Sequence, residues 1–221
     1  MVGPLSCLKS TGFSVFLGDH KQLLAVMKSD ANKRDGSDVS LFERLMEQNI
    51  VPSIMLVVQH RMQPAIVEFP NDAYYGGFLQ TLVRRRPLPR GFEWPSKLPI
   101  AFVNVAGVES GRCMNITEIE VIVQIVGDLL AAHDVHADEL VVLTYYNEQV
   151  AALEDDFRAK RMRILVSSID SFQGSEARIV ILSCVRCNRK GFIGFLGDRR
   201  RLNVGMTRAR EGLIIVGCQA M

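Results

Sequence analysis

The sequence lacks the features that mark several large classes of protein. No apolar run approaches the roughly 20 residues that a membrane-spanning helix needs. The opening MVGPLSCLKSTG has neither the cationic start nor the long apolar stretch of a secretory signal. There is no internal repeat and no low-complexity tail. The net charge is only +2 over 221 residues, so any nucleic-acid partner must be argued from where the charges lie.

Cysteine is scarce and scattered, which excludes a disulfide framework. The chain has five cysteines, and Cys184 and Cys187 form a CxxC without a second CxxC or a histidine pair. We therefore expect reduced thiols and no metal site, in a protein of the cytoplasm or the nucleus. The lack of a long apolar run predicts that the chain makes no membrane contact.

Two phosphate-handling motifs are also missing. The 221 residues contain no GxxxxGK[ST] loop and no acidic pair on a strand that would hold Mg²⁺. The chain taken alone therefore lacks a cradle for the phosphates of a nucleotide.

Short apolar runs alternate with amphipathic stretches. The runs are β-branched and nearly continuous, as in strands whose two faces are both covered. This alternation predicts an α/β fold with a mostly parallel, doubly wound sheet and helices on both faces. The expected strands are residues 13–17, 53–58, 100–105, 140–143, 163–168, 178–185 and 212–217.

Capping patterns predict where three helices begin. Ser40 with Glu43, and Asn115 with Glu118, have the spacing of a capping box. The second pair opens a helix to residue 132, and Asn147 is expected to cap a helix that runs to Phe157. The polar residues 28–38 and the proline-rich residues 84–99 are expected to be loops.

Arginine is concentrated near the end of the chain. Arg200, Arg201, Arg208 and Arg210 are expected on one helix that starts near Asp198. Arginine keeps its charge and matches phosphate oxygens bidentately, so such a helix favours an anionic ligand. A solvated basic surface is the alternative.

Five motifs follow one another in a fixed order: LGDHKQL (17–23), QHRMQPAIVEFPNDAYYGGFL (59–79), LTYYNEQ (143–149), SSIDSFQGSEARIVILSCVR (167–186) and GDRRRLNVGMTRAR (197–210). The ordered set resembles the C-terminal half of a superfamily 1 helicase motor. Within that superfamily it resembles the nonsense-mediated-decay RNA helicases, the regulators of nonsense transcripts.

The resemblance implies a RecA-like fold of the P-loop NTPase type. Residues 1–56 would be the tail of a first RecA-like domain, and residues 57–221 a second. The cofactor would be ATP with Mg²⁺. The residues that coordinate the Mg²⁺ ion are expected in a missing N-terminal half. Partners would be single-stranded RNA or DNA, the missing domain and mRNA-decay proteins.

The resemblance also assigns roles around the nucleotide. Gln22 would place the attacking water, Arg61 would contact the γ-phosphate, and Arg208 would be the arginine finger. Glu176 would contact the nucleotide at the ribose, and an ion pair between Glu176 and Arg178 is the alternative. Gly18, Asp19 and His60 complete this set, and His60 stands where the family usually has an aromatic residue.

For the nucleic-acid track, the resemblance implies four polar residues: Thr144, Tyr146, Ser168 and Gln173. The arginines at 84–86 either touch the nucleic-acid backbone or form a solvated loop. The rival to the helicase interpretation is a degenerate, non-catalytic domain that binds nucleic acid or a partner protein.

Overall fold

The computed structural model describes residues 14–24, 39–111 and 113–221. The chain divides into two compact units, Met1–Leu56 and Val57–Met221. The first unit contains helix α2 (Leu41–Glu47), which begins after Ser40. Ser40 Oγ accepts a hydrogen bond from the Glu43 N–H at 3.0 Å, as the capping pattern predicts.

Two expected strands are largely missing. Residues 14–17 form no strand, because no strand of the described residues lies beside them to pair with. The expected strand at 53–58 is reduced to its last residue, in β1 (Val58–Gln59). β1 pairs in parallel with β2 (Gln80–Thr81) in a sheet of its own. The predicted loop at 28–38 lies outside the described residues.

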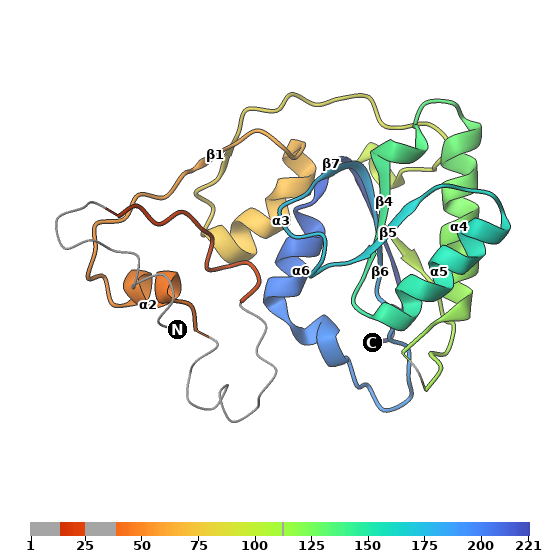
Figure 1. Cartoon of the computed structure of the whole chain (residues 1–221). Coiled ribbons are helices and arrows are strands. Elements are labelled where there is room, and N and C mark those ends of the chain that lie inside the picture. Colours follow the sequence, from red (N-terminus) through yellow and green to blue (C-terminus); the bar gives the residue numbers. More distant parts are fainter. Residues whose placement is uncertain (1–13, 25–38, 112) are drawn as a thin grey trace. The chain divides into compact units, whose positions relative to one another are not determined.

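The second unit is built on a five-stranded sheet in which all neighbours are parallel (Figure 1). In spatial order the strands are β3 (Ile100–Asn104), β7 (Ala209–Gly217), β6 (Ala177–Ser183), β4 (Leu140–Thr144) and β5 (Leu165–Ser168). All five coincide with expected runs, which confirms the predicted sheet.

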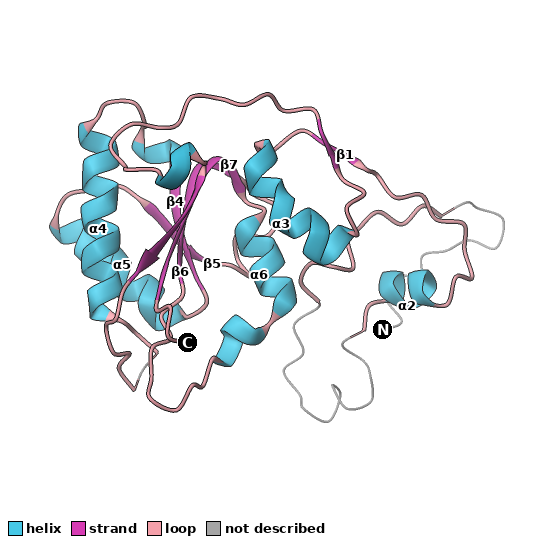
Figure 2. Ribbon diagram, turned by 180° about the vertical axis from the view of Figure 1, so that it is seen from behind, coloured by secondary structure: helices cyan, strands magenta, loops and turns pink. Residues whose placement is uncertain are grey.

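Helices cover both faces of this sheet (Figures 1 and 2). Helices α4 (Ile116–Ala131) and α5 (Asn147–Ala159) lie on one face, and α3 (Pro64–Tyr75) and α6 (Arg199–Met206) on the other. Ile122, Leu129 and Phe157 pack on the first face against Ile181 and Ile214. The fold is therefore a doubly wound, RecA-like α/β domain.

The helix boundaries correct two expectations. Asn115 caps α4 as predicted, accepting a hydrogen bond from the Glu118 N–H at 3.2 Å. α5 begins one residue earlier than expected, because the buried Tyr146 keeps the extended backbone of the preceding strand and occupies the N-cap. α6 starts after Asp198 but ends at Met206, so Arg208 and Arg210 lie beyond the helix.

Residues 84–99 are irregular except for the short 3₁₀ turn Pro95–Lys97, as predicted. Trp94 anchors this segment: its Nε1–H donates to Pro89 O at 2.8 Å, and the ring is 9% exposed. The indole lies so close to β7 that a methyl group added at Gly212 would be 2.6 Å from it. Among the described residues, no helix combines the length and the apolar character that crossing a bilayer requires.

Candidate nucleotide and nucleic-acid sites

Three segments of the second unit meet at Arg61. The Arg61 Nε–H donates to Glu176 Oε2 at 2.6 Å, and Nη1 donates to Thr207 O at 3.0 Å. Arg210 Nη1 lies 3.6 Å from the other oxygen of Glu176. The hydrogen bond from Arg61 holds the pKa of Glu176 below its usual range, despite partial burial. Both groups keep substantial exposure, 30% for Arg61 and 41% for Glu176, so the pair is open to exchange for another anion.

Gln59 shapes the loop that carries Arg61. Its side-chain oxygen accepts the Arg61 N–H at 2.9 Å and the Met62 N–H at 2.8 Å. Its amide nitrogen donates to Thr81 Oγ1 on β2. Sequence reasoning missed Gln59, although its place as the first residue of QHR was a signal for a loop-fixing amide. His60, between Gln59 and Arg61, is exposed.

Arg208 is buried beside this cluster and is 2% exposed. Nε donates to Val204 O at 3.1 Å, and Nη1 to Ser175 O at 3.2 Å. Nη2 donates to Thr207 Oγ1 at 3.0 Å. The guanidinium is thus held in one orientation by the end of α6 and by the chain that leads into β6.

The cluster lies at the amino ends of β6 and β7, where Ala177 pairs with Ala209. The general rule that open α/β sheets bind ligands at the carboxyl ends of their strands therefore does not locate it. Glu176 directly precedes β6, and Arg208 directly precedes β7. The first residues of these two strands therefore fix where both side chains begin.

In the first unit, Gln22 and Asp19 close a turn. The Gln22 side-chain amide donates to Asp19 Oδ2 at 2.9 Å. The backbone N–H of Gln22 donates to Asp19 O, and that of Lys21 to Asp19 Oδ1. Gly18 directly precedes this turn. The GDHKQ motif therefore presents Asp19 and Gln22 from one short loop.

The four expected track residues lie at or beyond the carboxyl ends of β4 and β5: Thr144 and Ser168 end these strands, and Tyr146 and Gln173 follow them. Ser168 Oγ donates to Ser171 Oγ at 2.9 Å, and the Tyr146 hydroxyl accepts the Phe195 N–H. Gln173 is exposed on the segment from β5 to β6. Thr144 is completely buried, and its Oγ1 has no hydrogen-bond partner among the described residues. A direct contact of Thr144 with a ligand therefore needs the strand end to open.

A family model described as AAA domain, AAA_12, matches residues 37–220. The chain belongs to this family.

Curated relatives show which branch it resembles. A homolog of regulator of nonsense transcripts 1 from Arabidopsis thaliana is 39% identical over 92% of this chain and 17% of its own length. The ATP-dependent helicase NAM7 of Saccharomyces cerevisiae is 37% identical over 92% of this chain and 22% of its own. The chain is thus similar to superfamily 1 helicases of the nonsense-mediated-decay type, and it spans about a fifth of the length of these relatives.

Among solved structures, the complex of the arterivirus helicase, nonstructural protein 10, with DNA covers 90% of this chain. The match covers 32% of that chain at 18% identity, with a TM-score of 0.46. At this level the likeness says nothing of what the present chain binds.

Two further arginines of this AAA_12 domain, Arg201 and Arg178, form ion pairs within the second unit. Arg201 bonds to Asp170 at 2.9 and 3.1 Å and pairs with Asp198. Glu176 pairs with Arg61 and not with Arg178, which instead binds Glu211 at 2.7 Å.

Arg86 makes an ion pair that neither of the two sequence alternatives for residues 84–86 includes, although its side chain stays 53% exposed. Its guanidinium pairs with the buried carboxylate of Glu211, and its N–H donates to Gln63 Oε1. Arg84 and Arg85 are also exposed, and no ion pair of theirs is found among the described residues.

The cysteines meet in an unexpected pair. Cys187 Sγ lies 2.8 Å from the Sγ of Cys218, which follows β7. The hydrogen bond to Cys218 raises the pKa of Cys187 to about 11. Among the described residues, no group of three or more histidine, cysteine, aspartate or glutamate side chains is placed to hold a metal ion.

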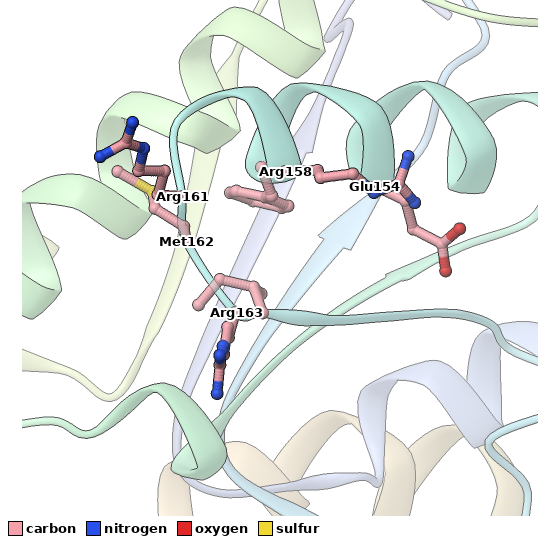
Figure 3. A pocket seen from close by; sticks show the side chains of 7 residues that line it. Glu154, Arg158, Arg161, Met162 and Arg163 are labelled. Atoms are coloured by element: carbon pink, nitrogen blue, oxygen red, sulfur yellow. The ribbon is translucent and has the colours of Figure 1, made fainter.

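A hollow of about 620 Å³ opens between the end of α5 and the start of β5 (Figure 3). It is lined by Glu154, Phe157, Arg158, Arg161, Met162, Arg163 and Ile164. It contains none of the residues in the Arg61 cluster or at the carboxyl ends of the strands. One of its arginines, Arg158, is paired with Asp155 at 2.6 Å. The hollow therefore belongs to neither candidate site.

Proposed function

We propose that residues 57–221 are the second RecA-like domain of an ATP-dependent helicase motor, and that residues 1–56 are the end of the first. The observation that carries this is the convergence of Arg61, Glu176 and the chain before β7, three segments remote in sequence, at one cluster. Phosphoryl transfer spreads negative charge over equatorial oxygens, and positioned guanidinium groups stabilise that charge.

In this proposal Arg61 exchanges Glu176 for the γ-phosphate, and Glu176 then contacts the nucleotide. Arg208 is the arginine finger, and because its guanidinium is buried and bonded to Val204 O and Ser175 O, it must turn outward to reach the nucleotide. Gln22, beside Gly18 and Asp19, places the attacking water, and His60 lies against the nucleotide. ATP brings the phosphate to be transferred, and the Mg²⁺ ligands would come from a preceding P-loop domain.

The substrate would be single-stranded RNA or DNA, held at the carboxyl edge by Tyr146, Ser168 and Gln173, with Thr144 as a supporting residue. The relatives named regulator of nonsense transcripts support a role in mRNA surveillance, in the cytoplasm or the nucleus, with mRNA-decay proteins as partners. A non-catalytic helicase-like module is the second candidate, favoured by the absence of a GxxxxGK[ST] loop from the 221 residues.

The test is made in a protein in which a P-loop domain precedes these residues. Arg208→Ala should lower kcat by about 10³-fold or more and leave ATP affinity nearly unchanged, because a finger acts on charge that develops in the transition state. Arg163→Ala, a change at an exposed arginine outside the cluster, is the control. Equal losses of binding and turnover would show that Arg208 is a ground-state or structural contact.

The 221-residue chain should also release phosphate only at background, with or without poly-U, because it lacks the P-loop donors. Robust RNA-stimulated turnover by this chain alone would overturn the half-motor assignment.

A further inference from the structure

The segment between β6 and α6 presents aromatic side chains to solvent. Within residues 188–197, named here the aromatic loop, Phe192 is 63% exposed, Phe195 is 50% exposed and Ile193 is 44% exposed. Clustered apolar side chains of this size at a surface are costly to leave in water and mark binding sites. No motif role assigned above accounts for them.

The backbone of the aromatic loop is held in place. The Asn188 side chain accepts the Phe192 N–H at 3.0 Å and donates to Phe192 O at 2.9 Å. Arg186 adds two further hydrogen bonds to the same carbonyl, each 3.1 Å long. The Phe195 N–H donates to the Tyr146 hydroxyl at 3.2 Å. The aromatic rings are therefore presented on a preorganised loop, which lowers the entropy cost of binding.

The rings of Phe192 and Phe195 each contact an arginine, and Phe195 also contacts a second aromatic ring. The Arg201 guanidinium lies 4.7 Å from the centre of the Phe195 ring, and the Tyr146 ring lies 5.5 Å away. The Arg186 guanidinium lies 4.9 Å from the Phe192 ring. Gly194 permits the close approach, since a methyl group there would be 2.6 Å from the Tyr146 hydroxyl. Rings supported in this way suit stacking against planar ligands.

The aromatic loop lies at the edge where the nucleic-acid track is proposed. Tyr146 follows β4, and Arg201 is bonded to Asp170, two residues beyond the end of β5. Arg189 and Lys190, within the loop, are exposed and form no ion pair among the described residues. A surface that interleaves aromatic rings and unpaired cations suits a strand whose bases and phosphates alternate.

We propose that Phe192 and Phe195 form a stacking platform for unpaired bases of single-stranded nucleic acid, with Arg189 and Lys190 on the neighbouring phosphates. The proposal rests on the proposed function and adds base contacts to a track otherwise made of polar groups. Every base has a stacking face, so the platform binds without reading sequence.

The experiment compares a short labelled oligo-adenosine with an abasic oligomer of the same length and charge, by fluorescence anisotropy on the 221-residue chain. Replacing both Phe192 and Phe195 by Ala should weaken oligo-adenosine binding about tenfold or more. Binding of the abasic oligomer should change little. Phe102→Ala, at a 49% exposed phenylalanine on β3, is the matched control and should change neither.

Replacing both by Leu keeps the loop apolar and removes the ring faces, so it should give the same base-dependent loss without a folding defect. Equal losses of affinity for both oligomers, or no loss for either, would overturn the stacking platform without contradicting the proposed nucleic-acid track. Failure of the unaltered chain to bind either oligomer at low salt would overturn the track as well. A concentration-dependent dimer that the Ala replacements abolish, with unchanged oligonucleotide affinity, would assign the surface to self-association instead.

Discussion

Glu118 is a carboxylic acid buried where α4 begins, and its shortest hydrogen bonds come from the last residue of β6 and from the chain that follows this strand. Ser183 Oγ donates to it at 2.7 Å and the Val185 N–H at 2.9 Å. Burial outweighs these bonds and raises the pKa of Glu118 to about 7 from a reference value of 4.5. The folded protein therefore binds this proton more tightly than the unfolded chain does.

The stability contributed by this proton is fully present below pH 4.5 and is lost as the pH rises through about 7. At roughly 1.4 kcal/mol per pKa unit, the loss is on the order of 3 kcal/mol. Urea unfolding should show this loss in the free energy of unfolding between pH 5 and pH 8 for the unaltered chain. The loss should be much smaller for Glu118→Gln. Glu120→Gln, at an exposed position of the same helix, is the control and should behave like the unaltered chain. A pH dependence that survives in Glu118→Gln would assign it to other groups.

Residue-scale placement was predictable where the signal was local. Asn115 and Asp198 cap their helices with side-chain acceptors three residues or fewer from the donors. The pairing of Arg86 with Glu211, which lies 125 positions away, could not be read from local sequence. The same holds for Thr144, whose burial depends on neighbouring strands and not on its own motif.

At the scale of elements, Trp94 packs closely on β7, and a methyl group added at Gly212 would be 2.6 Å from its ring. Gly212→Ala should lower the free energy of unfolding by about 1–3 kcal/mol, because the added methyl group meets the indole and the core must shift. Urea denaturation measures the change. Gly111→Ala is the matched control, since nothing lies within 4 Å of a methyl group there. If both variants lose the same stability, the cause is the glycine backbone and not the indole contact.

The strands of the main sheet were predictable because each is a short apolar run covered on both faces. The Arg-rich helix was extended too far, because Gly205 lies inside α6 and neither Thr207 nor Arg208, where the helix gives way to the strand, is a glycine or a proline. Helix α3 was not assigned from the sequence, and it carries a proline at its start and Pro70 within it. The run at 53–58 has strand character, but strand formation also needs a partner.

At the scale of the whole molecule, charge is nearly balanced, so the single-strand binding that we propose would depend on a few exposed arginines. Replacing Arg84 and Arg85 by Gln should flatten the salt dependence of single-strand binding, by about 0.7 in log–log slope for each lost phosphate contact. Gln173→Ala should weaken binding with little change in slope, because a neutral side chain releases no counterions. Anisotropy titrations over a range of salt concentrations give both quantities. An unchanged slope in the arginine variant would remove residues 84–85 from the interface.

The order of the sheet has a consequence for synthesis on the ribosome. β7 is the last of the described strands to be translated, yet it lies inside the sheet between β3 and β6. A nascent chain that stops before residue 209 can pair β4 with β5 and β6, but it leaves β3 detached and one side of β6 open. Unpaired strand edges attract aggregation and cellular quality control. A prematurely terminated copy of this chain therefore cannot complete its sheet, and its exposed edges distinguish it from the finished protein.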